Sequence, residues 1–122
     1  DEYLDANKQN PQPSTTPTSS PSTKKEATIV VTYAGQNGSV IEVGSYINNV
    51  YEDGGICTLT LTKDGSTITK QAMGVKDVSK TICPSFSVNR SEFNSAGIWQ
   101  AVVSYESVHS SGKTSAQEVA VQ

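Results

Sequence analysis

Cys57 and Cys83 are the residues whose type and spacing most clearly predict chemistry in this chain. They are its two cysteines, with 25 residues between them, and no CxxC pair or Cys/His grouping of the kind that binds zinc accompanies them. In a strand-rich chain such a pair predicts a disulfide formed in an oxidising compartment. Closing that loop would stabilise the fold by roughly 3–4 kcal/mol. The alternative that stays open is two separate buried thiols in a cytosolic protein.

His109 is the single histidine, and it stands between Val108 and Ser110 in a Ser-rich segment. A histidine that acts as a general base needs an orienting partner and a pocket. A Ser-rich turn predicts instead that its side chain lies in solvent. If both cysteines are paired, no thiolate nucleophile remains. We therefore expect a protein that is not an enzyme.

Glu52, Asp53 and Asp64 are acidic residues in predicted turns, where carboxylates and backbone carbonyls together can bind calcium. The chain has neither the EF-hand spacing nor a dense Asp repeat. Turn formation explains the same residue types without a metal. We expect no metal ion and no cofactor.

Tyr46 and Tyr51 bracket residues 47–50 and are the candidate residues for contact with a partner. We expect both to stand near one end of the folded domain, where exposed tyrosines make good contact residues. The alternative is that they pack across the edge of a sheet. The residues alone leave both interpretations open.

Composition divides the chain into two parts. From Pro11 to Thr23, twelve of thirteen residues are Pro, Ser or Thr, and such a segment has too little apolar surface to offset its ordering entropy. We predict a disordered linker or stalk over residues 1–26 and one domain over residues 27–122. The formal net charge is −3, and the charges in the domain are mixed in sign. This distribution argues against nucleic acid and anionic membrane surfaces as partners.

Strand patterns with a period of two recur along the predicted domain, and no segment has the 3.6-residue period of an amphipathic helix. The clearest is 57–62, where Cys57, Leu59 and Leu61 share one face. Asp64-Gly65 predicts a two-residue hairpin turn that sets Leu61 opposite Ile68. The seven predicted strands are 28–33, 40–47, 57–62, 66–70, 82–88, 98–107 and 114–121.

The segments between these strands carry their own predictions. Residues 73–80 form a crossover between sheets, 89–92 a single helical turn that delivers Phe93 to the core, and 109–112 a polar turn. Pro84 lacks a donor, so it belongs at an edge or at an irregular start of the strand. The predicted core residues are Leu59, Leu61, Phe86, Trp99 and Val103. Seven strands in fewer than 100 residues predict an all-β fold, a sandwich of two antiparallel sheets.

Two stretches resemble a known class of domain. Residues 50–60 (VYEDGGICTLT) and 97–105 (GIWQAVVSY) are similar to strands of secreted bacterial immunoglobulin-like or fibronectin type III-like sandwich domains. That resemblance implies a module outside the membrane, behind an anchor and a Thr/Pro-rich linker. Trp99 follows Cys83 by sixteen residues, whereas antibody domains have Trp between the two cysteines. The antibody disulfide topology and binding loops are therefore not carried over.

These observations predict a non-enzymatic cell-surface or secreted domain that serves adhesion, partner binding or structural display on its stalk. Its partner would be a protein or glycan at the cell surface, and an anchor upstream of Asp1 would supply any membrane attachment. Two alternatives stay open. One is the globular part of a pilin-like appendage subunit, and the other is a carbohydrate-binding module of a secreted protein.

Overall fold

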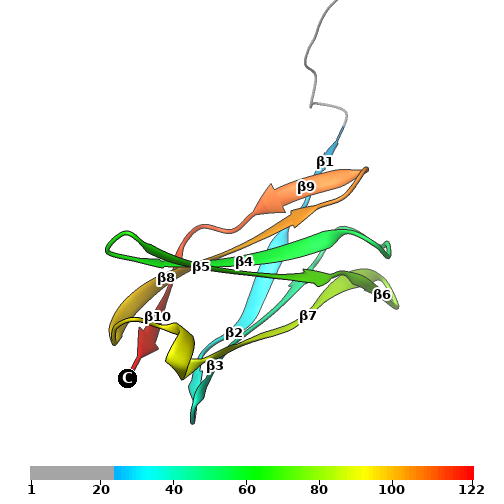
Figure 1. Ribbon diagram of the computed structural model, residues 1–122. Coiled ribbons are helices and arrows are strands. Elements are labelled where there is room, and N and C mark those ends of the chain that lie inside the picture. Colours follow the sequence, from blue (N-terminus) through cyan, green and yellow to red (C-terminus); the bar gives the residue numbers. More distant parts are fainter. Residues whose placement is uncertain (1–23) are drawn as a thin grey trace, which may run out of the picture.

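The computed structural model describes residues 24–122, so most of the predicted linker lies outside the described residues. The described part is a two-sheet β-sandwich, as predicted (Figure 1). It contains ten strands and one 3₁₀ turn, η2 (Arg90–Glu92). Within residues 24–122, no helix is long and apolar enough to cross a membrane.

Sheet I has the strand order β2-β3-β7-β6, and all of its pairs are antiparallel. Sheet II has the order β1-β9-β8-β4-β5, with β10 also paired to β8, and its one parallel pair is β1 with β9. The bounds in sheet I are β2 Ile29–Asn37, β3 Val40–Ile47, β6 Val75–Asp77 and β7 Lys80–Asn89. Those in sheet II are β1 Lys25–Glu26, β4 Ile56–Lys63, β5 Ser66–Met73, β8 Gly97–Glu106, β9 Ser110–Lys113 and β10 Gln117–Val121.

The hairpin of β4 and β5 has the predicted register. Leu61 pairs with Ile68, and Thr60 pairs with Thr69. Asp64 and Gly65 both have positive φ, 48° and 85°, which is the backbone signature of a type I′ turn. This turn type matches the twist of the two strands and so sets their register.

The core lies between the sheets and contains all five predicted core residues. Trp99 is 1% exposed, and its indole N–H donates to the Ser95 carbonyl at 3.1 Å. The predicted helical turn is present as η2, and it delivers Phe93 to the edge of the Trp99 ring, with centroids 5.0 Å apart. The two predicted core residues of β8, Trp99 and Val103, therefore lie on its buried face.

The disulfide joins the two sheets, because Cys57 lies on β4 and Cys83 on β7. The Cα atoms are 6.0 Å apart, and both residues are buried. The predicted pairing is confirmed.

Three local predictions were wrong. The alternating pattern of 28–33 predicts that Ile29, Val31 and Tyr33 share one face, but a register shift at Thr32 sends Tyr33 to the outer face, where it is 49% exposed. The expected crossover at 73–80 is shorter, because β5 reaches Met73 and β6 starts at Val75 in the other sheet. The expected turn at 109–112 is the strand β9.

Pro84 lies where its missing donor predicted. It stands in β7 at a register shift opposite β3, beyond the segment that pairs with β6. A strand can accept proline there because no regular ladder bond is lost.

Candidate functional site

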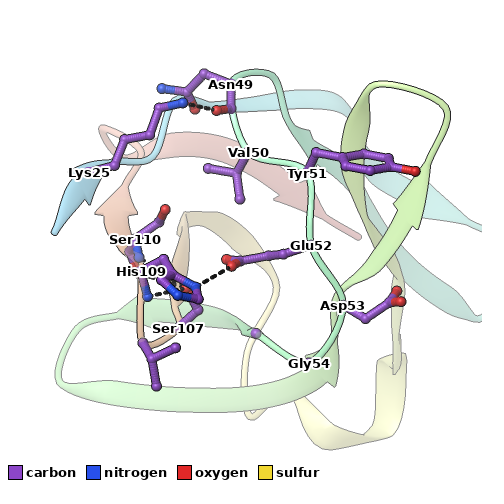
Figure 2. Close-up of a pocket in the computed structure, with 12 residues that line it drawn as sticks. Lys25, Asn49, Val50, Tyr51, Glu52, Asp53, Gly54, Ser107, His109 and Ser110 are labelled. Atoms are coloured by element: carbon purple, nitrogen blue, oxygen red, sulfur yellow. Dashed lines mark hydrogen bonds and ion pairs between the residues drawn. The ribbon is translucent and has the colours of Figure 1, made fainter.

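One end of the sandwich has a depression of about 480 Å³ (Figure 2). Its walls come from the β3–β4 loop, from the β8–β9 turn and from the start of β1. Val50 lies in the middle of it and is buried. Glu52 and His109 face each other on one side, while Lys25 and Asn49 lie on the other. These are separate segments that the sandwich fold brings to the same end.

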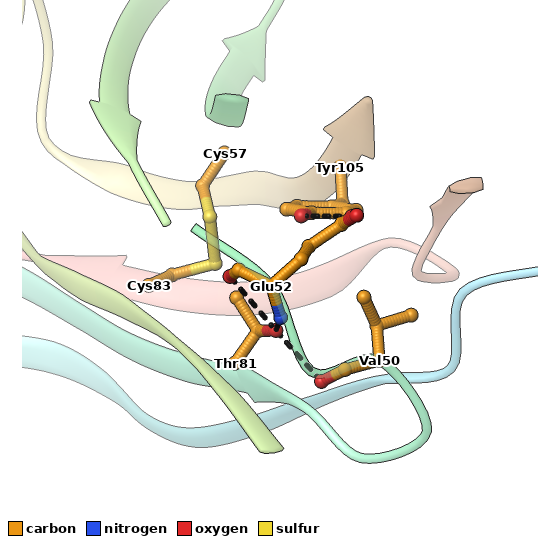
Figure 3. Close-up of a disulfide and its surroundings, with 6 residues drawn as sticks. All are labelled: Val50, Glu52, Cys57, Thr81, Cys83 and Tyr105. Carbon is orange, nitrogen blue, oxygen red and sulfur yellow. Dashed lines mark hydrogen bonds between the residues drawn. A yellow bond between two sulfur atoms is a disulfide. The ribbon is translucent and has the colours of Figure 1, made fainter. Parts of the chain in front are cut away.

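Thr81, which is fully buried at the start of β7, holds the β3–β4 loop in place (Figure 3). Its hydroxyl donates to the Val50 carbonyl at 2.7 Å and accepts the Glu52 N–H at 3.1 Å. A buried hydroxyl with these partners satisfies loop backbone groups that would otherwise lack a hydrogen bond. The position of Glu52 therefore depends on a residue of sheet I.

Gly55 allows the same loop to approach sheet II closely. A Cβ atom at this position would lie 2.1 Å from the Tyr105 hydroxyl oxygen. The absence of a side chain thus leaves room for the Tyr105 ring to reach Glu52. Gly74, at the junction of β5 and β6, donates its N–H to the Gly55 carbonyl at 2.7 Å and accepts the Gly54 N–H at 3.3 Å.

The Glu52 carboxylate is the polar centre of the depression. Tyr105 donates its hydroxyl to Oε2 at 2.5 Å, and His109 Nδ1 lies 3.3 Å from Oε1. Partial burial raises the pKa of Glu52, but hydrogen bonds with Ser107, Tyr105 and His109 outweigh it and hold that pKa below its usual value. Burial, together with the bond to Glu52, raises the pKa of Tyr105. The carboxylate is therefore charged at neutral pH, and the phenol keeps its proton.

The Ser107 hydroxyl shapes the β8–β9 turn. Its oxygen accepts the backbone N–H of His109 at 3.1 Å and that of Ser110 at 3.0 Å. These bonds present the His109 ring to Glu52, and Val108 stands out at the tip of the turn, 82% exposed. This hydroxyl thus orders the turn, in addition to its hydrogen bond with Glu52.

Asn49 attaches the N-terminal part of the domain to the β3–β4 loop. Its side-chain oxygen accepts the Thr28 N–H, and its side-chain nitrogen donates to the Glu26 carbonyl, both at 2.8 Å. The Lys25 ammonium donates to the Asn49 carbonyl. The described chain thus enters the fold beside the depression.

The two tyrosines singled out from the sequence lie in different surroundings. Tyr51 lines the depression and is 55% exposed, with its ring directed toward the β6 side and the Lys76 ammonium 5.3 Å from the ring centroid. Tyr46 is half-buried on the outer face of sheet I, with the Lys80 ammonium 5.6 Å from its ring. Their role in partner contact stays a prediction.

The three candidate calcium ligands do not come together. Asp64 lies in the β4–β5 turn, and the eight-residue strand β4 separates it from the loop that carries Glu52 and Asp53. Asp53 accepts the Lys76 N–H at 2.7 Å. His109 is exposed, as predicted, with 78% of its side chain accessible. However, it has a carboxylate partner that the sequence did not indicate. Tyr105 gave no signal beyond its place in the predicted strand 98–107, and Thr81 lies between the predicted crossover 73–80 and the predicted strand 82–88.

Comparison with protein-family models, with curated proteins and with solved structures gives no match to this chain.

Proposed function

We propose that this chain is a non-enzymatic extracellular domain of the immunoglobulin-like or fibronectin type III-like class, which binds a protein or glycan at a cell surface. The observation that carries the proposal is the end of the sandwich around the depression. Three separate loops lie at this end, and each presents an exposed apolar side chain: Tyr51, Val78 and Val108, which are 55%, 88% and 82% exposed.

The arrangement of the loops supports a binding role for this end. The β6–β7 turn, which carries Val78, belongs to it because Thr81 at the start of β7 pairs with Ile47 at the end of β3. Large apolar side chains that are exposed at the tips of turns do not stabilise the domain. A partner that covers them would gain the favourable free energy of burying their apolar surface. Loops on a rigid sandwich are also where recognition residues commonly lie.

Strand order supports the proposed class. In the immunoglobulin nomenclature, β2, β3, β7 and β6 of sheet I correspond to strands A, B, E and D. In sheet II, β5, β4, β8 and β9 then correspond to strands C′, C, F and G. The buried disulfide favours an oxidising compartment and hence an extracellular or cell-surface location. The Pro/Ser/Thr-rich segment before the domain has the composition of a stalk.

The polar groups of the depression favour binding over catalysis. Ser107 uses its hydroxyl oxygen to accept two backbone N–H groups, and the bonded nitrogen of His109 faces a carboxylate. A serine nucleophile would need its hydroxyl directed at the histidine base. The present bonds instead stiffen two loops that would contact a partner.

The test uses the full 122-residue chain, immobilised through its N-terminus and probed with a glycan array and with purified extracellular matrix proteins. We expect saturable binding to one of these probes. The variant Tyr51→Ala/Val108→Ala should weaken it at least tenfold, because both exposed contact side chains are removed. The matched control is Tyr33→Ala, which removes a similarly exposed tyrosine from the middle of β2.

The outcome separates the alternatives. Binding lost in the double variant and kept in the Tyr33 variant supports the proposed surface. A chain that binds none of the probes, or one whose binding is the same in both variants, contradicts it.

A further inference from the structure

Most free edges of the two sheets carry a feature that prevents pairing with another strand. In sheet I, β6 has three residues, the rest of β7 contains Pro84, and β2 has a register shift at Thr32. In sheet II, the edge strand β1 has two residues. Short strands, prolines and bulges are the usual means by which proteins protect sheet edges from association.

The edge strand β5 has none of these three features. Its eight residues, Ser66–Met73, pair with β4 without a register shift, and they include neither proline nor glycine. Within residues 24–122, no strand pairs with its other side. An extended, regular strand of this kind is a template for a further strand.

The register shows which backbone groups point to the open side. The type I′ turn at Asp64-Gly65 makes Lys63 and Ser66 a hydrogen-bonded pair, and such pairs alternate along an antiparallel ladder. The groups of Ser66, Ile68, Lys70 and Ala72 therefore face β4. The N–H and C=O groups of Thr67, Thr69 and Gln71 point outward.

Lys70 is the charged residue of β5, and a lysine directed inward on an edge strand is itself a protective device. Here its ammonium lies 2.8 Å from Glu92 Oε1 on η2. The charge is thus compensated within the same domain. The side chains that flank the outward backbone groups are neutral: Thr67, Thr69 and Gln71.

We propose that β5 pairs with β5 of a second copy of this chain, antiparallel about a two-fold axis at Thr69. In that register Thr69 faces Thr69 of the second copy, and Thr67 faces its Gln71. Seven residues of each strand, 66–72, are paired, with two hydrogen bonds in each of the three outward-facing pairs. Neutral threonine pairs across strands are favourable.

Other registers are worse. A shift of the axis to Lys70 would also pair seven residues, but it would set Lys70 directly opposite Lys70 of the second copy, and like charges in that position are unfavourable. A shift to Ile68 would pair five residues of each β5 strand. The position of Lys70 in β5 thus favours the register centred on Thr69, and the two-fold symmetry of that register closes it as a dimer.

Such a contact is small. Pairing two edge strands buries less than the roughly 1,200 Å² of a typical stable interface. We therefore expect a weak dimer, populated at high concentration or where many copies share one surface, since tethering raises the effective concentration toward the millimolar range. The inference does not depend on the function proposed above, because Thr69 lies in the middle of β5 and outside the depression.

The test is sedimentation of the full 122-residue chain from micromolar to millimolar concentration. We expect a reversible monomer–dimer equilibrium. Thr69→Lys should weaken it at least tenfold, because two ammonium groups would face each other across the axis. Thr60→Lys is the matched control, since Thr60 lies beside Thr69 on the same face but on the inner strand β4, and it should change the dissociation constant less than twofold.

Charge reversal separates a specific loss from misfolding. An equimolar mixture of Thr69→Lys and Thr69→Glu should form the heterodimer, while each variant alone stays monomeric. Hydrogen exchange in the wild-type dimer should slow at the amides of Thr67, Thr69 and Gln71 and stay unchanged at Ile68 and Lys70. A chain that is monomeric up to millimolar concentration, or a dimer that the Thr69 variants leave intact, overturns the proposal.

Discussion

The Tyr105 hydroxyl donates a 2.5 Å hydrogen bond to the Glu52 carboxylate and so connects β8 with the β3–β4 loop across 53 positions of sequence. The strand patterns around the two residues do not by themselves predict this contact. Gly55 leaves the space for the ring, and Thr81 holds the backbone of Glu52. Together with the hydrogen bonds of Thr81, this bond connects both sheets to the loop end of the domain.

Glu52 makes the stability of the domain depend on pH in the acid range. Its pKa is lower in the folded than in the unfolded chain. Its contribution is therefore complete above the unfolded pKa near 4.5 and is lost as pH falls through the folded pKa. We expect Glu52→Gln to destabilise the domain at pH 7 and this difference from wild type to shrink as the pH falls below about 4.5. Urea unfolding across this pH range measures it.

The control for this experiment is Glu118→Gln, a change at an exposed carboxylate on β10. It should retain the acid profile of the wild-type protein. A Glu52→Gln variant with a pH-independent difference from wild type would contradict the role given to the carboxylate.

Thr81→Val keeps the shape of the side chain and removes its hydroxyl. The Val50 carbonyl and the Glu52 N–H then lose their partner, which should lower the free energy of unfolding by about 1–3 kcal/mol. Chemical denaturation gives this value, and hydrogen exchange should show faster exchange at Glu52. The same change at exposed Thr67 should alter stability by less than about 0.5 kcal/mol, so an equal effect at both positions would refute the assignment.

The double variant Cys57→Ala/Cys83→Ala removes the link between the sheets. The disulfide closes a segment with a sequence separation of 26, and its removal should cost about 3–4 kcal/mol. Guanidinium unfolding with and without reductant measures it. Reductant should destabilise the wild type and leave the double variant unchanged, whereas free thiols in protein from its native source would rule out the disulfide.

Val78 has φ = 56° in the turn between β6 and β7, a conformation that costs most L-residues roughly 1–2 kcal/mol. Asparagine tolerates it better, and the 88% exposed valine has little packing to lose. We expect Val78→Asn to raise the free energy of unfolding by about 1 kcal/mol. Val108→Asn, at an equally exposed position with ordinary φ, should leave it unchanged, and thermal unfolding compares the two.

The main features of the fold could be predicted from local patterns. Strict alternation over residues 57–62 allows one orientation of the strand, because only one of its faces can be buried in the core. Asp64-Gly65 then sets the register of the strand that follows. The errors have local causes too. The bulge at Thr32 reverses the faces of β2, and no glycine at that position indicates it in the sequence. The hydroxyl of Ser107 closes the β8–β9 turn earlier in the chain than the predicted turn at 109–112.

The site was less predictable, because it depends on contacts between distant segments. Tyr51 could be found as an aromatic residue in a turn. The contact between Glu52 and His109 could not be predicted, because 57 positions separate the two residues and the sequence around either one does not indicate the other. Thr81 lies just before the predicted strand 82–88, and its hydroxyl acquires a role when the β3–β4 loop folds over it.

The position of the disulfide also determines how the domain would respond to mechanical tension. Because Cys57 and Cys83 join β4 to β7, the 26 peptide units between them cannot lengthen when the two ends of the chain are pulled apart. At about 3.5 Å per residue, the oxidised chain would be roughly 90 Å shorter than the reduced chain when fully extended. Single-molecule force spectroscopy would register this difference as a shorter extension step.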